Sequence, residues 1–255
     1  MARERYLLNA DEDTIHENVI ELRSKKDIRK NWWYYNKVKV LVGILLAAAA
    51  AYFVYSVFFT VKPDYTIAVV NQISLDQSAL DIMGSHIADY GEDLNGDGKV
   101  VVNMVNYSVD TAAATDPSYP QTLQAFYVKF AGDMGSGDSM IWLHDMVGYK
   151  QIGEDVNGMF EKLDAENTTG NGTMLDITEI PGLNNIDYSG YTDGMVFTPE
   201  NIKEINSALR LSIREVEGSN IERSEKLTKY HDDCERLFQN LLTDTKVSSN
   251  GVPLG

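Results

Sequence analysis

The chain has 255 residues, of which 44% are hydrophobic and 24% charged, a balance typical of folded globular proteins. Its formal net charge of −16, from 38 acids and 22 bases, excludes the concentrated basic surface that nucleic-acid binding requires. The single cysteine, Cys234, excludes an intrachain disulfide.

The first 39 residues hold nine of the 22 bases and seven of the 38 acids, so residues 40–255 hold 13 bases and 31 acids. The segment Val40–Val61 is a run of 22 residues without a charge. As a helix it would be about 33 Å long, which matches the hydrocarbon core of a bilayer. A buried core helix is rarely apolar on every side, and a cleavable signal peptide is shorter and lies nearer the N-terminus. We therefore expect an uncleaved transmembrane helix.

Basic residues predict the orientation of this span. Seven Lys and Arg residues lie from Arg23 to Lys39, opposed only by Asp27, whereas Lys62 is the one base between the span and Lys99. An excess of bases marks the cytoplasmic side of a span. The expected organisation is a cytoplasmic head at 1–39, a transmembrane helix at 40–61, an extracellular α/β domain at 62–245 and a flexible tail at 246–255.

The first half of the outer domain alternates strands and helices. A helix is expected between each pair of strands, the first from Ser74 or Asp76 to Tyr90 and the second over Thr122–Met134. An alternation of this kind predicts right-handed crossovers and a mainly parallel sheet flanked by helices. The expected strands are Thr66–Val70, Val100–Tyr107 and Ser139–His144.

The second half begins with residues 165–198, which are rich in Asn, Gly, Thr and Asp and are expected to form loops. Thr198 as N-cap and Gly218 as the residue after the C-cap then favour one helix up to Val216. A competing interpretation is a strand, because Leu209, Leu211 and Ile213 alternate. The caps favour the helix, and with a second helix at Asn220–Thr243 they predict a C-terminal helical pair.

One turn has the spacing of a calcium-binding loop. Asp93, Asn95 and Asp97 supply oxygen atoms at positions 1, 3 and 5, and Gly98 occupies position 6. Position 12, where such a loop carries an acid, is Met104. The alternatives are a Ca²⁺ site and an acidic turn between a helix and a strand.

Polar and aromatic residues follow the expected strands at their carboxyl ends, where ligands bind in open α/β sheets. Tyr107, Trp142, His144 and Asp145 are therefore candidates for binding a small polar ligand. In the competing interpretation Trp142 belongs to the core and the others are ordinary loop residues.

The sequence shows no catalytic or zinc-binding motif. The four histidines look isolated, without an HExxH or CxxC pattern or a G-x-S-x-G nucleophile turn. We therefore expect a protein that is not an enzyme and has no cofactor apart from the Ca²⁺ alternative.

Four sequence phrases resemble the first lobe of bacterial extracellular solute-binding proteins of ABC importers. They are TIAVV, ADYGEDLNGDGKVVVNMVNYSVD, TLQAFYVKFAGDMGSGDSMIWLHD and GMFEKLD, which lie between Asp64 and Asp164. The resemblance implies a periplasmic-binding-protein-like lobe. That family has two lobes and usually a cleaved, lipidated signal, whereas Lys62–Gly255 has the length of one lobe with a helical addition and follows an internal anchor.

The expected function is that of a membrane-anchored, non-catalytic binding or assembly module outside the cytoplasm. Its expected partners are the lipid bilayer and another membrane or envelope protein, with a role accessory to a transporter or an envelope complex. The alternative is a receptor that binds a sugar or peptide through a single solute-binding-like lobe. An extracellular hydrolase is the least favoured function, because no catalytic constellation supports it.

Overall fold

The computed structural model describes residues 24–58, 62–107, 115–152, 158–163, 168–192 and 197–254. The chain forms two compact units, Met1–Thr60 and Val61–Gly255. The first 23 residues of the expected head and the last three of the expected span lie outside the described residues.

The first unit contains one long helix, α1 (Lys25–Phe58). Its segment Lys25–Ser56 is long and apolar enough to cross a membrane, and none of its most apolar stretch is buried within the protein. Large apolar side chains such as Leu45 and Phe53 are about 70% exposed. From Val40 to Ser56 this helix is apolar on every side, unlike the one-sided helices that cover a globular core.

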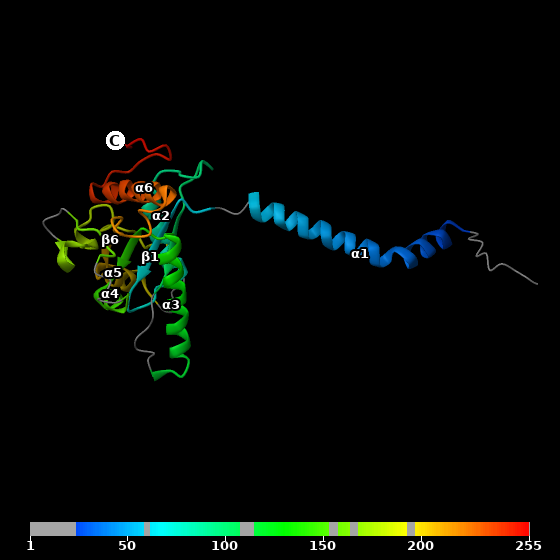
Figure 1. Ribbon diagram of the computed structural model, residues 1–255, viewed down its shortest axis with the longest axis horizontal. Helices are drawn as coiled ribbons and strands as arrows, with labels where there is room; N and C mark the ends of the chain where they lie inside the picture. The colour runs from blue at the N-terminus through cyan, green and yellow to red at the C-terminus, as the bar shows by residue number, and fades with distance from the viewer. Residues whose placement is uncertain are drawn as a thin grey trace, which may run out of the picture. The chain divides into compact units, whose positions relative to one another are not determined.

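The second unit is an α/β domain (Figure 1). Its elements are, in chain order, β1 (Tyr65–Val70), α2 (Gln77–Ala88), β2 (Val102–Asn106), α3 (Tyr119–Ser136), β3 (Ile141–His144), α4 (Met146–Ile152), β4 (Thr168–Thr169), the 3₁₀ turn η4 (Gly170–Gly172), β5 (Met174–Asp176), the 3₁₀ turn η5 (Ile177–Glu179), α5 (Pro199–Ser207), β6 (Arg210–Ile213) and α6 (Glu225–Leu242).

The sheet is mixed, which corrects the prediction of a mainly parallel one. Its six strands have the order β2-β1-β3-β6-β5-β4. The strands β2, β1 and β3 are parallel, as the strand–helix alternation predicts. The other three strands pair antiparallel with their neighbours. The strand β6 is antiparallel to both β3 and β5, and β5 is antiparallel to β4.

The prediction of a C-terminal helical pair is wrong in the extent of its first helix, which was expected to reach Val216. Thr198 caps α5 as expected, with its side chain accepting from the backbone N–H of Asn201, but the helix ends at Ser207. The next residues form β6, in which Leu211, Ser212 and Ile213 are all buried. Burial on both sides of a sheet favours a strand over a helix, which would have turned part of this segment toward solvent.

The strands divide their side chains between two faces, since successive residues point to opposite sides. On one face the odd residues of β1 pack with α2 and α6, and this larger core includes Ile67, Leu143 and Phe238. On the other face Ala68 and Trp142 pack with α3 and α4. The domain therefore has three layers, with its sheet buried on both sides.

The helix α6 closes the larger core. Ser224 caps it by accepting from the backbone N–H of Leu227, and an amphipathic stripe including Cys234 and Leu241 is buried. Residues 246–254, for which a flexible tail is expected, make backbone contacts with the domain. The N–H of Val247 donates to the Asp89 carbonyl at 3.0 Å.

Candidate functional site

His144, a predicted ligand-binding residue, is fully buried at the end of β3. The hydroxyl of Ser212 donates to the Thr173 carbonyl, so at 2.9 Å from this hydroxyl oxygen the Nε2 of His144 is the donor. The ring lies against those of Tyr149 and Phe160. Burial, reinforced by the charge of Arg210, lowers the pKa of His144 to about 4, so the ring is neutral at pH 7.

The predicted ligand residues Tyr107 and Trp142 are also buried, and their rings stack at 5.7 Å. The Tyr107 hydroxyl donates to the Asp133 carboxylate at 2.6 Å, and burial raises its pKa. The indole N–H of Trp142 donates to the Ser139 carbonyl at 3.0 Å. The polar atoms of both residues are therefore engaged within the domain.

Asp145 is the one of these four residues that is partly exposed. One carboxylate oxygen accepts from the backbone N–H of Gln72 at 2.8 Å and the other from that of Gly148 at 2.5 Å. Asp145 therefore joins the loop after β1 to the first turn of α4, and this is a structural role. Ligand binding by Tyr107, Trp142, His144 and Asp145 stays a prediction.

The turn that resembles a calcium loop is held by hydrogen bonds from its own backbone. The carboxylate of Asp93 accepts from the N–H groups of Gly96 and Gly98 at 2.7 Å, and these bonds lower its pKa. The side chains of Asn95 and Asp97 each accept from the N–H two residues further on. These hydrogen bonds hold the turn in shape, and Ca²⁺ at Asp93, Asn95 and Asp97 stays a prediction.

A second acid fixes this turn to the sheet, and sequence reasoning missed it. Asp64, which precedes β1, is 4% exposed. One of its carboxylate oxygens accepts from the N–H groups of Leu94 and Asn95, and the other accepts from that of Val101 at 2.8 Å. Its only sequence signal is its place just before a strand, where many acids are simply solvated.

The helix α3 carries an exposed apolar groove. The sequence pattern alone does not distinguish the residues of this groove from those on the side of α3 that packs against the core. In Figure 1 the N-terminal half of α3 extends past the strands. Phe126 packs into the domain, whereas the adjacent Tyr127 and Val128 are 49% and 68% exposed. The groove is lined by Pro120, Leu123, Gln124, Tyr127, Val128 and Ala131, all uncharged.

A group of possible metal ligands lies on α6. One ligand atom from each of His231, Asp232 and Glu235 lies within 4.8 Å of the others. His231 is therefore not isolated, contrary to the sequence expectation. The i, i+4 spacing of His231 and Glu235 on a helix was the signal that could have found it.

In the region of the resemblance to a solute-binding lobe the strands β2, β1 and β3 are parallel, and β6 pairs antiparallel with β3. The end of the last resembling phrase, Asp164, lies outside the described residues. Comparison with protein-family models, curated proteins and solved structures finds no match to this chain. Membership of the solute-binding family stays a prediction.

Proposed function

We propose that this chain is a membrane-anchored, non-catalytic binding module that docks a helical segment of another membrane or envelope protein along α3. The observation that carries the proposal is the uncharged groove of α3, about 480 Å³ in volume. Exposed apolar grooves of this kind are sites where amphipathic helices bind.

The proposed anchor is α1. Its apolar stretch is unburied, and the bases before it predict that the N-terminus is cytoplasmic and the α/β domain is outside. Anchoring confines the search for a partner to the membrane surface, so a modest apolar surface is sufficient for assembly with another membrane protein. A role accessory to a transporter or envelope complex belongs to this proposal.

The spacing of the groove residues fits a helix as the occupant. Residues 120, 124, 127, 128 and 131 follow the i, i+4 and i, i+7 rows of α3, and helices pack by fitting the ridges of one into the grooves of the other. The small residues Ala131, Gly132 and Gly135 allow a partner helix to approach this end of α3 closely, since no neighbouring atom lies within 4 Å of a Cβ placed at either glycine.

Charge favours a different protein over a second copy of this chain. Residues 62–255 hold 13 bases and 31 acids, so two outer domains repel each other. A partner with a neutral or basic surface around an apolar helix avoids this repulsion.

A small-ligand receptor has less support than a docking module. The pocket beneath α5, beside Leu183, Tyr188 and Asn206, has a volume of about 80 Å³. Sites for drug-sized ligands usually have volumes of about 300–1,000 Å³. This pocket has room for a few water molecules or a small aliphatic group. A more open hollow beside Asp64 and Tyr230 has a volume of about 440 Å³, but none of the four predicted ligand residues lines it. The side chains of those four residues are hydrogen-bonded within the domain.

Site-specific photo-crosslinking of the full chain in its native membranes tests the proposal. The crosslinker replaces Val128 in the groove and, as a control, Glu204 on the exposed side of α5. We expect a product of defined mass from position 128 and none from position 204. Ala131→Glu, which places a charge in the groove, should abolish the product, whereas Gln121→Glu, an equal charge change on α3 outside the groove, should retain it.

Two results would refute the proposal. A product with twice the mass of the chain would show that the groove holds a second copy. A product that forms equally from both positions, or survives Ala131→Glu, would show that crosslinking reflects general proximity rather than docking on α3.

A further inference from the structure

The three possible ligands on α6 combine one imidazole with two carboxylates. His231 and Glu235 are one helical turn apart and lie on the same side of α6, with Asp232 beside them. Their ligand atoms lie within 4.8 Å of one another. Zinc bonds to nitrogen and oxygen are about 2.0–2.2 Å long, so a tetrahedral ion needs ligand atoms about 3.4 Å apart. A movement of about 1 Å, within reach of side-chain rotation, would close the site.

The structure already orients His231 as metal-binding histidines are oriented. The residue is 4% exposed, and its Nε2 lies 2.8 Å from the Arg214 carbonyl oxygen. A carbonyl oxygen only accepts, so Nε2 carries the hydrogen and Nδ1 presents its lone pair. Metal-ligating histidines commonly donate their second ring N–H to a backbone carbonyl in this way, which fixes both the tautomer and the ring orientation. The acceptor, Arg214, lies outside the cluster.

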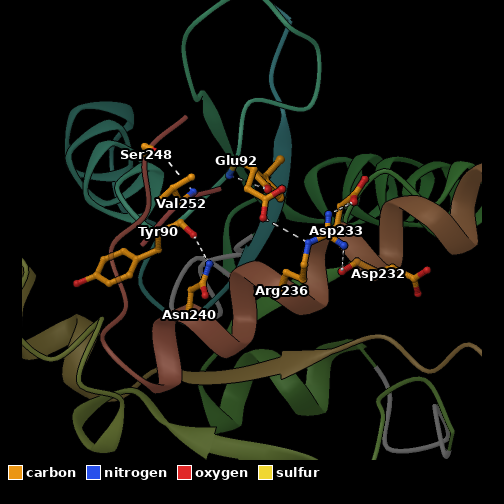
Figure 2. Close-up of polar contacts among 9 residues, drawn as sticks. Tyr90, Glu92, Asp232, Asp233, Arg236, Asn240, Ser248 and Val252 are labelled. Carbon is orange, nitrogen blue, oxygen red and sulfur yellow. Dashed lines mark hydrogen bonds and ion pairs between the residues drawn. The ribbon is translucent and has the colours of Figure 1, made fainter. Parts of the chain in front are cut away.

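The carboxylates of Asp232 and Glu235 are exposed, and within the described part of the chain neither has a hydrogen bond or ion pair. The neighbouring Asp233 differs, because it pairs with Arg236, which also contacts Glu92. Figure 2 shows the Arg236 side chain between Glu92 and Asp233, and the Asp232 carboxylate pointing away from it. Arg236 therefore pairs with Glu92 and Asp233 rather than with the carboxylates of the cluster.

We infer that His231 Nδ1, Asp232 and Glu235 form a binding site for a divalent transition-metal ion such as Zn²⁺. Imidazole nitrogen favours transition metals, whereas Ca²⁺ and Mg²⁺ take oxygen ligands. The inference is independent of docking at α3.

Calorimetric titration of Zn²⁺ into the full-length chain in detergent, purified without a polyhistidine tag, tests this inference. We expect one Zn²⁺ per chain. The double variant Asp232→Asn/Glu235→Gln keeps the side-chain shapes at two exposed positions, and it should bind Zn²⁺ at least about tenfold more weakly. The control Glu200→Gln/Glu204→Gln makes the same change in net charge on α5 and should leave the affinity unchanged.

Zinc-edge X-ray absorption of the loaded chain identifies the donor atoms without a substitution at the buried histidine. We expect one imidazole and two or three oxygen neighbours, without sulfur. Equal weakening in both double variants, or a spectrum without imidazole, would overturn the inference. So would the absence of stoichiometric binding, or heat from Ca²⁺ but not from Zn²⁺.

Discussion

Acidification should destabilise the α/β domain through His144. The side chain is fully buried, its Nε2 donates to Ser212, and burial lowers its pKa from an ordinary 6.5 to about 4. The folded state therefore favours the neutral ring. The stability that His144 provides is fully present above pH 6.5 and is lost as the pH falls toward 4, because the unfolded chain takes up the proton first.

The size of the effect follows from the shift in pKa. Each pKa unit corresponds to about 1.4 kcal/mol, so complete protonation favours the unfolded state by about 3 kcal/mol. Between pH 7 and pH 5 the linkage relation gives a loss of about 2 kcal/mol in the free energy of unfolding. This is a large fraction of the about 5–15 kcal/mol that stabilises a typical domain.

Urea unfolding followed by tryptophan fluorescence measures this loss. Trp142 is fully buried in the domain, and the other two tryptophans, Trp32 and Trp33, lie on α1. In the full chain carrying Trp32→Phe and Trp33→Phe, fluorescence therefore reports on the domain alone. The midpoint should fall progressively from pH 7 to pH 5 with an unchanged slope.

His144→Phe separates this residue from the other titrating groups. Phenylalanine keeps the ring contacts with Tyr149 and Phe160 and does not titrate in this range. The stability of this variant should fall by about 2 kcal/mol less than that of the parent between pH 7 and pH 5. The opposite contribution of Glu161, whose raised pKa favours folding at low pH, is common to both proteins and cancels. Equal pH profiles for the two proteins would refute the reasoning.

Three further predictions concern single residues of the domain. Asp64→Asn should lower the free energy of unfolding by about 3 kcal/mol, because an amide cannot accept from backbone N–H groups on both sides; an unchanged urea midpoint would contradict it. Gly148→Ala should destabilise by more than about 2 kcal/mol, since its Cβ would lie 2.0 Å from the Val70 carbonyl oxygen. The matched change Gly132→Ala, in open space on α3, should stabilise by about 0.5–1 kcal/mol, and thermal unfolding that ranks these two variants otherwise would refute the packing argument. Burial raises the pKa of Cys234 to about 12, so iodoacetamide should alkylate the folded chain at pH 8 at least about tenfold more slowly than the urea-unfolded chain.

Local patterns were sufficient to predict the parallel half of the sheet. The expected strand Thr66–Val70 is observed at Tyr65–Val70, and Ser139–His144 is observed at Ile141–His144. Each strand is a short apolar run bounded by turn residues, so its own sequence carries the information. The apolar run of α1 was equally clear, because a charge-free stretch of that length is rare in a globular fold.

The position of β6 could not be predicted in the same way. Its four residues follow a well-capped helix without a glycine or proline between them, and the alternation at 209, 211 and 213 also occurs in helices. The deciding factor is pairing with β3, about 70 residues earlier in the chain. Long-range pairing of this kind overrides local propensity and leaves little trace in the sequence.

The sequence indicated that the candidate residues lie near strand ends, but it did not indicate which of them are buried. His144 and Asp145 lie at the carboxyl end of β3 and Tyr107 follows β2, yet the His144 ring is covered by those of Tyr149 and Phe160. Both covering rings come from later segments that carry no periodic signal. The cluster at His231 is the reverse case, since its helical spacing was readable and only the contact with Arg214 reveals its orientation.

The central position of β6 also determines when the sheet can be completed during synthesis of the chain. As the chain is synthesised, β3 is complete at residue 144, but its antiparallel neighbour is not made until residue 213. Until then one edge of β3 has unpaired backbone groups, a template for pairing with another chain. The centre of the sheet is therefore completed only when β6, near the C-terminus, has been synthesised. A nascent chain stopped before Arg210 would keep an unpaired, aggregation-prone edge on β3, which a chaperone would have to cover.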